Sequence, residues 1–507
     1  MEPKDIKESS REQARLQQDL WEIAQSPWKT GVLPNPEILS RARESLPRSL
    51  PTDGIGFDSA KRHILDDIVP AFNGSSISPN YYGFITGGTT PAALFADNLV
   101  SVYDQNVQVH LSEHSIATDV ESIALGLLVD LFRLDRNEWH NGTFTTGATA
   151  ANLLGLACGR EFAVRAAADK KGVSKHSVGE WGLFDVMHAS GLSGLQVLTT
   201  LPHSSIGKSA GILGFGRANV INVCRDGSTN PLEFDLEKLE CELSRPDKAS
   251  IVAVSCGEVN TGRFATAGRT KMQELRDLCD KYGAWLHVDG AFGLFARVLD
   301  DSPEFASIRA GSDGLELADS ITGDAHKLLN VPYDCGFFLT RHRNESANVF
   351  TNPNAAYLTG GADPSSIPSP LNIGIENSRR FRALPVYATL LSYGSLGYRS
   401  VLERQIRLAR RLSAWLFDHP EYNILPETNT KEVQLDYTFM IVLFSAKQDD
   451  LNQTLAARIN ATSKMFVSGT SWQGRPACRI AISNWRADEE RDFDLVTGVL
   501  DEVARQA

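Results

Sequence analysis

Residues 250–290 alternate between apolar runs and an amphipathic segment, and this alternation constrains the fold more than any other part of the sequence. SIVAVSCG (250–257) and AWLHVDG (284–290) are predicted to be buried strands. Between them, Arg269–Tyr282 carries its apolar residues on one helical face, and Gly283 stands where a helix is expected to end. A strand–helix–strand repeat of this kind predicts an α/β fold with a mostly parallel sheet covered by helices.

Two charged residues stand where such a sheet would place a ligand. Ligands bind at the carboxyl ends of parallel strands, and Asp289 ends the most apolar strand of the chain. Lys327 lies in SITGDAHKLLNVPYDCG, which is predicted to enter the core. A lysine that forms a Schiff base and an aspartate that holds a pyridinium nitrogen are what pyridoxal phosphate (PLP) chemistry takes from a protein. The plainer alternatives are a lysine whose stem covers apolar surface and a carboxylate that caps a turn.

Two further segments could complete a cofactor site. FTTGATAAN (144–152) brings hydroxyl groups and a glycine to the start of a helix that is expected near Leu153. Free backbone amides at such a start favour an anion such as phosphate, although a capped helix without a ligand is the alternative. His203 follows the strand-like VLTTL and could either stack on a cofactor ring or serve as an ordinary hydrogen-bonding residue.

The composition of the chain excludes several classes of partner and of site. Its 507 residues are 42% hydrophobic and 22% charged, enough for two or more domains. A net charge of −12 argues against nucleic acid or an anionic membrane as the main partner. The seven cysteines form no close pairs, which favours reduced thiols in a cytoplasmic protein over disulfides or a metal site. No secretory signal and no membrane-spanning apolar run are recognised.

The sequence pattern divides the chain into three parts. Residues 1–90 are predicted to form an N-terminal helical arm that contacts a partner subunit, residues 91–385 a large cofactor-binding domain, and residues 386–507 a smaller C-terminal α/β domain. Residues 341–372 are rich in Asn, Pro, Gly and Ser, so we expect a long loop there, either a mobile lid or a disordered segment.

Six segments, taken together and in order, resemble the group II PLP-dependent amino-acid decarboxylases, a branch of the fold type I PLP enzymes. These segments are FTTGATAAN, LPHSSIGK, GEVNTG, HVDGAFG, ADSITGDAHKLLNVPYDCG and ENSRRFRAL. The resemblance extends from about residue 75 to about residue 490. It implies the fold type I architecture with helices on both faces of the sheet, PLP as the cofactor, and a homodimer with its active site at the subunit interface. The implied reaction is decarboxylation of an L-amino acid to the amine and carbon dioxide.

The resemblance also implies a role for each matching residue. Lys327 matches the lysine that carries the cofactor, Asp289 the partner of the pyridinium nitrogen, and His203 the histidine that stacks on the ring. Tyr357 matches a loop tyrosine that returns a proton to the product carbon. The other matches are the cofactor-binding residues Ala148, Thr149, Ala291 and His326 and the substrate-binding residues Tyr81, Tyr82, Thr86 and Arg479.

Several positions depart from the usual family pattern, which suggests an outlying subfamily. The family usually has Trp, Gly, Asp and Lys where this chain has Leu328, Ala148, Ala265 and Pro385. None of these differences removes a catalytic group.

Substrate and reaction type are the open part of the interpretation. Tyr81, Tyr82 and Phe84 could form a flat apolar slot, so an aromatic substrate is favoured. The alternatives are an acidic or diamino acid as the substrate, or a different reaction on the same cofactor, such as an aldehyde synthase or a carbon–carbon lyase. A non-catalytic relative, which the presence of Lys327, Asp289, His203 and Tyr357 argues against, and a scaffold protein without a cofactor are the remaining alternatives.

Overall fold

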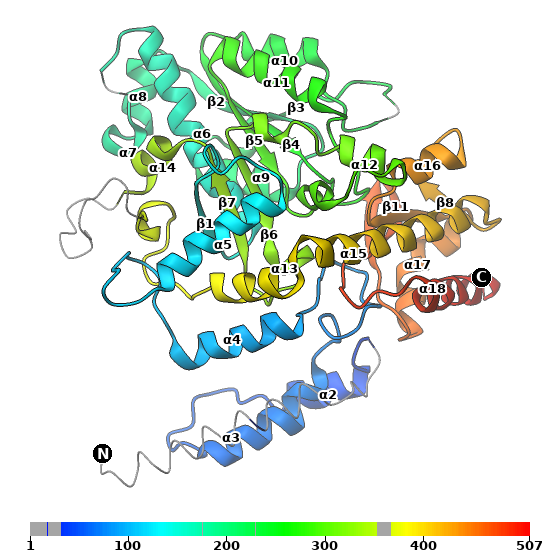
Figure 1. Cartoon of the computed structure of the whole chain (residues 1–507). Helices are drawn as coiled ribbons and strands as arrows, with labels where there is room; N and C mark the ends of the chain where they lie inside the picture. The colour runs from blue at the N-terminus through cyan, green and yellow to red at the C-terminus, as the bar shows by residue number, and fades with distance from the viewer. Residues whose placement is uncertain (1–17, 19–31, 175, 229, 352–366, 507) are drawn as a thin grey trace, which may run out of the picture.

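A mostly parallel sheet of seven strands forms the centre of the described part of the chain (Figure 1). The computed structural model describes residues 18, 32–174, 176–228, 230–351 and 367–506. The strand order is β1-β7-β6-β5-β4-β2-β3, and β7 runs antiparallel to both of its neighbours. The strands are β1 Asn141–Thr145, β2 Gly194–Thr199, β3 Val220–Asn222, β4 Lys248–Ser255, β5 Trp285–Asp289, β6 Ser320–Asp324 and β7 Gly336–Thr340. The predicted α/β fold is confirmed.

Helices cover both faces of this sheet, because successive strand residues point to opposite sides. Val197 and Ile251 pack in a cluster with α6 (Ala148–Lys170) and α9 (Ser204–Ile212). Their neighbours Leu198 and Val252 pack on the opposite face. That face is covered by α5 (Ala117–Leu131), α10 (Leu236–Leu243) and α11 (Arg269–Tyr282). The bounds of α11 match the predicted helix, and Gly283 ends it in the left-handed conformation.

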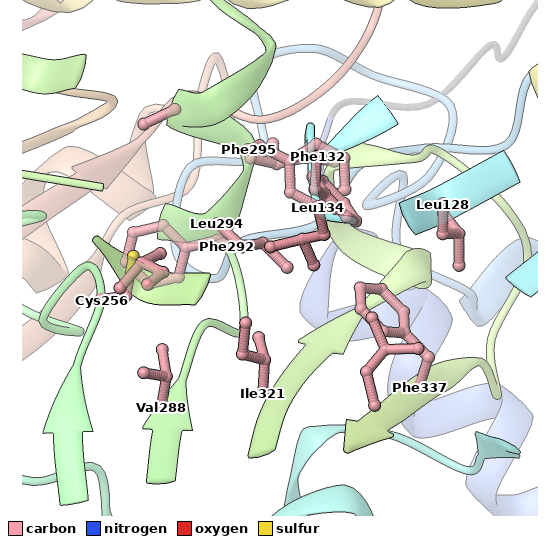
Figure 2. Close-up of a cluster of buried hydrophobic side chains, with 14 of the residues drawn as sticks. Leu128, Phe132, Leu134, Cys256, Val288, Phe292, Leu294, Phe295, Ile321 and Phe337 are labelled. Carbon is pink, nitrogen blue, oxygen red and sulfur yellow. The ribbon is translucent and has the colours of Figure 1, made fainter. Parts of the chain in front are cut away.

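The core on the α5 side holds the chain that leaves β5 (Figure 2). Phe295 and Leu294 follow Asp289 in a short 3₁₀ segment, Gly293–Val298. The ring of Phe295 contacts that of Phe132 edge to face at 5.1 Å between centroids. Burying a large apolar side chain contributes about 1.5–3 kcal/mol. This packing therefore anchors the turn directly after Asp289.

A second, antiparallel sheet of four strands, in the order β10-β11-β9-β8, lies in the C-terminal part of the described chain. Its elements are β8 Tyr422–Leu425, α16 Lys431–Tyr437, β9 Ile441–Ala446, α17 Asp449–Ala461, β10 Ser468–Trp472, β11 Arg475–Ala481 and α18 Glu489–Arg505. The expected smaller C-terminal α/β unit is therefore present. The domain boundaries drawn from the sequence stay predictions.

A long helix, α15 (Ala383–Asp418), runs from the large sheet to the small one (Figure 1). Its backbone departs from helical geometry at Gly394, where φ is 56°. Tyr398, Leu402 and Ile406 are buried in the core of the large sheet. Leu408, Ala409, Leu412 and Leu416 are buried in the core of the small sheet. One helix thus contributes to both cores.

The N-terminal helices lie below the large sheet in Figure 1. They are α2 (Pro36–Ser45), α3 (Phe57–His63) and α4 (Pro91–Tyr103), and the Thr90 hydroxyl caps α4. Residues 1–17 and 19–31 of the predicted arm lie outside the described residues, and its contact with a partner subunit stays a prediction. None of the helices in the described ranges combines the length and the apolar character that crossing a membrane requires.

The expectation of a continuous loop over residues 341–372 was wrong near both ends of this range. Arg343–Phe350 forms a helix, α14, and Pro370–Asn372 forms a 3₁₀ turn. The sequence of α14 has little apolar periodicity, and contacts with distant residues hold it instead. Arg165 pairs with Glu345, and the Asn141 side chain donates a hydrogen bond to Ser346 at 2.8 Å. The remaining short helices are α7 Val178–Trp181, α8 Leu183–Ala189, α12 Ala306–Ala310 and α13 Ala325–Leu328.

A buried carboxylate beside β6, Asp319, joins three elements. It accepts hydrogen bonds from the Leu286 amide at 2.7 Å, from Arg276 at 2.8 Å and from His342 at 2.7 Å. Burial acts to raise the pKa of Asp319, but His342 and Arg276 outweigh it, and the pKa lies below its usual range.

Replacing Asp319 by Asn should destabilise the protein in a pH-dependent way. Breaking a buried ion pair costs about 3–5 kcal/mol, so we expect a loss of that order at neutral pH. An unfolded aspartate has a pKa of about 3.9. Because the folded-state pKa of Asp319 is lower, its stabilisation is complete above that value and disappears as the pH falls through the folded-state pKa.

Denaturant unfolding of wild type and Asp319→Asn at several pH values measures this effect. The difference in unfolding free energy should shrink as the pH is lowered below about 4. The exposed Asp130, which pairs with Arg136 at the surface, provides the control variant Asp130→Asn. A difference between wild type and Asp319→Asn that is independent of pH would contradict the assignment.

Candidate active site

The carboxyl ends of β4, β5 and β6 open into a cavity of about 350 Å³. This is the edge at which parallel sheets bind ligands. Seven of the predicted site residues line the cavity, namely Ala148, Thr149, His203, Asp289, Ala291, His326 and Lys327. The structure therefore brings Lys327 and Asp289 to one cavity, although 38 positions of sequence separate them. Their roles there remain predictions.

Asp289 is held at the end of β5 by donors on both of its oxygens. The side-chain amide of Asn152 donates to Oδ2 at 2.9 Å, and the Ala291 backbone amide donates to Oδ1 at 3.3 Å. The Asp289 carbonyl accepts from the Cys256 amide at 2.9 Å, which joins β5 to the end of β4. The residue as a whole is 8% exposed. Its orientation is thus fixed while it can still accept one more hydrogen bond from a ligand.

Lys327 lies on α13, the short helix between β6 and β7. Its Nζ is 2.8 Å from Asp324 Oδ2 and 5.8 Å from the centroid of the Phe292 ring. Gly87 packs on the lysine backbone so closely that a Cβ there would come within 1.8 Å of the Lys327 carbonyl oxygen. The backbone is therefore enclosed, whereas the amine faces the cavity.

Asp324 is a site residue that the sequence analysis missed. Its Oδ1 accepts the Ala148 amide at 2.5 Å, and its Oδ2 pairs with Lys327. Burial acts to raise the pKa of Asp324, but the charges of Lys327 and His326 outweigh it and hold the pKa below the usual range. The carboxylate is therefore charged at neutral pH. The sequence did hold a signal for Asp324, because an acidic residue three positions before the lysine ends the preceding strand.

The predicted phosphate turn is shorter than expected. Helix α6 starts at Ala148 instead of near Leu153, so Thr149 lies in its first turn. The first amides of a helix have no partner within the helix. The amide of Ala148 is bonded to Asp324, and among the described residues no acceptor binds the amides of Thr149 and Ala150, both of which line the cavity. These two amides fit a phosphate.

His203 caps the start of α9 and leaves one ring nitrogen for a ligand. Its Nδ1 accepts the Ser205 amide at 3.2 Å and contacts the Ser205 hydroxyl at 2.8 Å. The hydrogen of the neutral ring is therefore on Nε2. The ring is open to the cavity, yet the surrounding atoms desolvate it enough to lower its pKa, against the opposing charge of Asp289.

These groups together fit PLP. Lys327 supplies the amine for a Schiff base, Asp289 the carboxylate for a pyridinium nitrogen, and the start of α6 the amides for a phosphate. All three belong to one cavity.

The predicted substrate-binding residues are placed unevenly. Tyr81 stacks on Phe466 at 4.7 Å between ring centroids, and the Tyr333 hydroxyl lies 3.5 Å from that of Thr86. Tyr82 is fully buried in the core of the small sheet, where its hydroxyl accepts from the Asn80 side chain at 2.9 Å. Tyr81, Tyr82 and Thr86 are all absent from the described residues that line the cavity.

Arg479 also lies behind the cavity wall. Its guanidinium donates to the Val259 carbonyl at 2.6 Å and to the Gly83 carbonyl at 2.7 Å. It therefore joins β11 to the turn after β4 and to the segment around Tyr81. Neither the sequence pattern nor the spacing could show that its donors bind backbone. Tyr357 lies outside the described residues, and its role stays a prediction.

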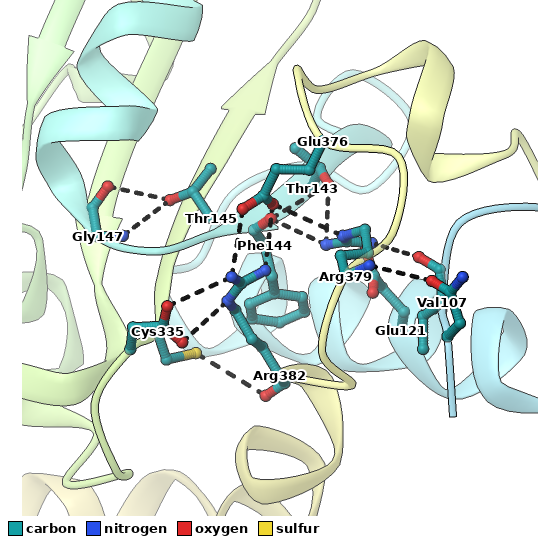
Figure 3. A network of polar contacts seen from close by, with 12 residues as sticks. Val107, Glu121, Thr143, Phe144, Thr145, Gly147, Cys335, Glu376, Arg379 and Arg382 are labelled. Carbon is teal, nitrogen blue, oxygen red and sulfur yellow. Dashed lines mark hydrogen bonds and ion pairs between the residues drawn. The ribbon is translucent and has the colours of Figure 1, made fainter. Parts of the chain in front are cut away.

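Two arginines of ENSRRFRAL, Arg379 and Arg382, support the site from outside the cavity (Figure 3). Arg379 donates to the Phe144 carbonyl at 2.9 Å and pairs with Glu121 at 2.7 Å, which holds the end of β1 before the phosphate turn. Arg382 pairs with Asp334 at 3.2 Å, which holds the chain between Lys327 and β7. These residues position the turn and the lysine segment and do not line the cavity.

Comparisons with known proteins found a matching family model and a set of relatives. The family model described as "Pyridoxal-dependent decarboxylase conserved domain" matches residues 42–438. An L-2,4-diaminobutyrate decarboxylase of Acinetobacter baumannii is 26% identical over 340 residues, which cover 65% of this chain and 62% of that protein. An aromatic-L-amino-acid decarboxylase of Catharanthus roseus is 23% identical over 485 residues, which cover 92% of this chain and 88% of that protein.

A solved structure shares the fold over the whole length. The crystal structure of Oryza sativa TDC with PLP and tryptamine superposes with a TM-score of 0.79 at 21% identity, covering 100% of this chain and 99% of that one.

Proposed function

This chain belongs to the pyridoxal-dependent decarboxylase family and is therefore an amino-acid decarboxylase that uses PLP, and we propose that its substrate is an aromatic L-amino acid. The products of the proposed reaction are the amine and carbon dioxide. The observation that carries the proposed site is that Lys327, Asp289 and the start of α6 line one cavity.

The predicted catalytic and cofactor-binding residues have defined tasks in this proposal. The bound cofactor supplies the electron sink that loss of carbon dioxide requires. Asp289 accepts the hydrogen of the pyridine nitrogen, and the amides of Thr149 and Ala150 hold the phosphate. His203, neutral with its hydrogen on Nε2, is suited to donate to the substrate carboxylate. Tyr357 is assigned the return of a proton to the carbon that has lost the carboxylate.

The charges of the cavity favour an aromatic over an acidic substrate. The described residues that line it include one lysine and no arginine, so an acidic side chain would lack a cation of its own. Aromatic rings lie at its wall instead. Phe292 lines the cavity, and the ring of Tyr333 is 4.4 Å from that of His326, which also lines it. Such surfaces suit a flat apolar side chain.

A diamino acid is the second candidate, because Glu258 lies in the cavity wall and a relative of similar identity is a 2,4-diaminobutyrate decarboxylase. The Glu258 carboxylate, however, accepts from the Asn260 amide at 3.0 Å and from the Thr261 amide at 2.9 Å. These bonds stabilise the turn after β4. A second substrate amine would have to compete with them.

An amine-release assay with the loaded enzyme tests the proposal. The panel contains the standard amino acids, dopa, 5-hydroxytryptophan and 2,4-diaminobutyrate, and both amine and aldehyde are measured. We expect the highest kcat/KM for an aromatic substrate, with amine as the main product. The highest value for diaminobutyrate would select the second candidate, and aldehyde as the main product would select the synthase reaction.

We also propose that the protein is a homodimer. Large apolar side chains are more than half exposed on α4, α5 and the first part of α15. These are Phe95, Val102, Tyr103, Ile123, Leu391 and Leu396. A patch of this kind is typical of a subunit interface. Analytical ultracentrifugation should give twice the chain mass of 55.5 kDa, and a monomer at micromolar concentration would contradict the proposal.

A further inference from the structure

A chain of buried polar side chains leads through the large sheet to Asp289. The Trp285 indole donates to Ser320 Oγ at 2.9 Å, and Ser320 Oγ is 2.8 Å from His287 Nδ1. His287 Nε2 is 2.9 Å from Asn152 Oδ1, and Asn152 Nδ2 donates to Asp289 at 2.9 Å. The first four residues are fully buried and Asp289 is 8% exposed. The inner members of this series are therefore out of contact with bulk water.

The chemistry of the two ends fixes the direction of every hydrogen bond. Asp289 only accepts, so Asn152 must present its NH₂ group to it and its Oδ1 to His287. His287 must then carry its hydrogen on Nε2, which leaves Nδ1 as an acceptor for the Ser320 hydroxyl. The indole at the other end only donates, and it occupies the Ser320 oxygen without competing for that hydroxyl hydrogen. Each donor in the chain is thus matched to one acceptor.

The environment of His287 keeps its ring neutral and in place. Burial lowers the pKa of His287 to about 4, although Asp289 acts in the opposite direction, so the ring has a single N–H at neutral pH. The ring packs on Gly155 of α6, where a Cβ would come within 2.4 Å of His287 Cε1. The glycine therefore allows the ring to reach Asn152.

Asn152 is also connected, through Ser205, to His203, which is another predicted cofactor-binding residue. Its Nδ2 donates to Ser205 Oγ at 3.0 Å, and Ser205 contacts His203 Nδ1 at 2.8 Å. The Thr322 hydroxyl donates to Asn152 Oδ1 at 2.8 Å, which supports the same orientation of the amide. One side-chain amide thus joins Asp289 and His203.

We propose that His287 is a positioning residue, whose Nε2 hydrogen holds the Asn152 amide in the orientation that presents a donor to Asp289. This inference rests on the proposed function, in which Asp289 holds the pyridine nitrogen. Without that hydrogen, the Asn152 amide loses a donor to Oδ1 and is less restrained against a rotation that would bring Oδ1 toward Asp289. Two acceptors would then face each other in a buried site, which is unfavourable.

Two substitutions of His287 separate the hydrogen bond from the packing. Gln can donate through Nε2 and accept through Oε1, as the ring does, whereas Leu can do neither. We measure the Kd of the purified apoprotein for PLP and the pH at which the absorption spectrum of the bound cofactor changes. A lost hydrogen bond to a charged network costs about 1.5–3 kcal/mol, so His287→Leu should raise the Kd about tenfold to a hundredfold.

His287→Gln should restore most of the affinity and the wild-type pH of the spectral change. Ser320→Ala keeps the ring and removes the hydroxyl that donates to Nδ1 and accepts from Trp285. It is the alternative test if His287→Leu does not fold, and it should shift both readouts in the direction expected for His287→Leu. Tyr422→Phe is the matched control, because it removes a buried hydrogen bond, to the Leu500 carbonyl at 2.8 Å, from the small sheet. It should leave both readouts unchanged.

The same measurements on Asp289→Asn distinguish the two proposals. If that variant binds PLP with wild-type affinity and an unchanged spectrum, the proposed role of Asp289 fails. If Asp289→Asn is impaired but the Leu and Gln variants of His287 behave alike, whether both as wild type or both equally impaired, the positioning role of His287 is overturned. In the Asp289→Asn background, the additional effect of His287→Leu should be small, because the charged acceptor is already absent.

Discussion

Lys327→Ala is expected to reduce kcat at least about 10⁴-fold and to remove the covalently attached cofactor. Among the described residues that line the cavity, Lys327 has the only primary amine, so no neighbour can replace it in a Schiff base. The substitution also leaves the buried Asp324 without its partner at 2.8 Å. We therefore expect a lower unfolding free energy of the apoprotein at neutral pH as well.

Reduction with borohydride followed by mass spectrometry gives a readout that does not depend on turnover. The wild type should gain the mass of reduced cofactor on the peptide that contains Lys327, and the Ala variant should gain none. Lys208, an exposed lysine on the neighbouring helix α9, provides the control Lys208→Ala, which should retain both activity and labelling. Labelling of another lysine in the wild type would overturn the assignment.

The second large effect is expected for Asp289→Asn, which should lower kcat about 10²–10³-fold with a smaller change in KM. The Asn side chain has nearly the same shape, and its oxygen can still accept from Asn152, so the fold should be maintained. What is lost is the negative charge that keeps the pyridine nitrogen protonated. The effect should therefore fall on the chemical step more than on substrate binding.

Kinetics at saturating PLP separate this effect from poor cofactor loading. Unchanged kcat under that condition would show that the charge at position 289 is not used in the reaction. Asp301→Asn, at an exposed carboxylate that pairs with Arg309 at the surface, should leave kcat unchanged.

The central strands and the helix between them could be predicted because their signals are local. The buried runs became β4 and β5, and the amphipathic segment with its terminal glycine became α11. The ordered set of motifs also identified most residues of the cavity. Strand ends in a parallel sheet meet at one edge, so residues at those ends were expected to converge.

The start of α6 could not be predicted because a distant residue determines it. Ala148 begins the helix with its amide bonded to Asp324, 176 positions later in the sequence. The orientation of Arg479 and of Tyr82 depends in the same way on packing between the two sheets. The buried position of His287 had a visible sign, a histidine within an apolar strand, but its partners Asn152 and Ser320 belong to other elements.

The continuity of α15 has a consequence for how this enzyme can be divided. Core residues of the large sheet extend along it to Ile406, and those of the small sheet begin at Leu408. A chimeric protein that exchanges the C-terminal part with a relative at any junction before Ile406 would take apolar side chains away from the part it leaves behind. The two sheets should therefore unfold as one cooperative unit. A recombinant of two relatives should fold only if α15 and the cores of both sheets come from the same parent.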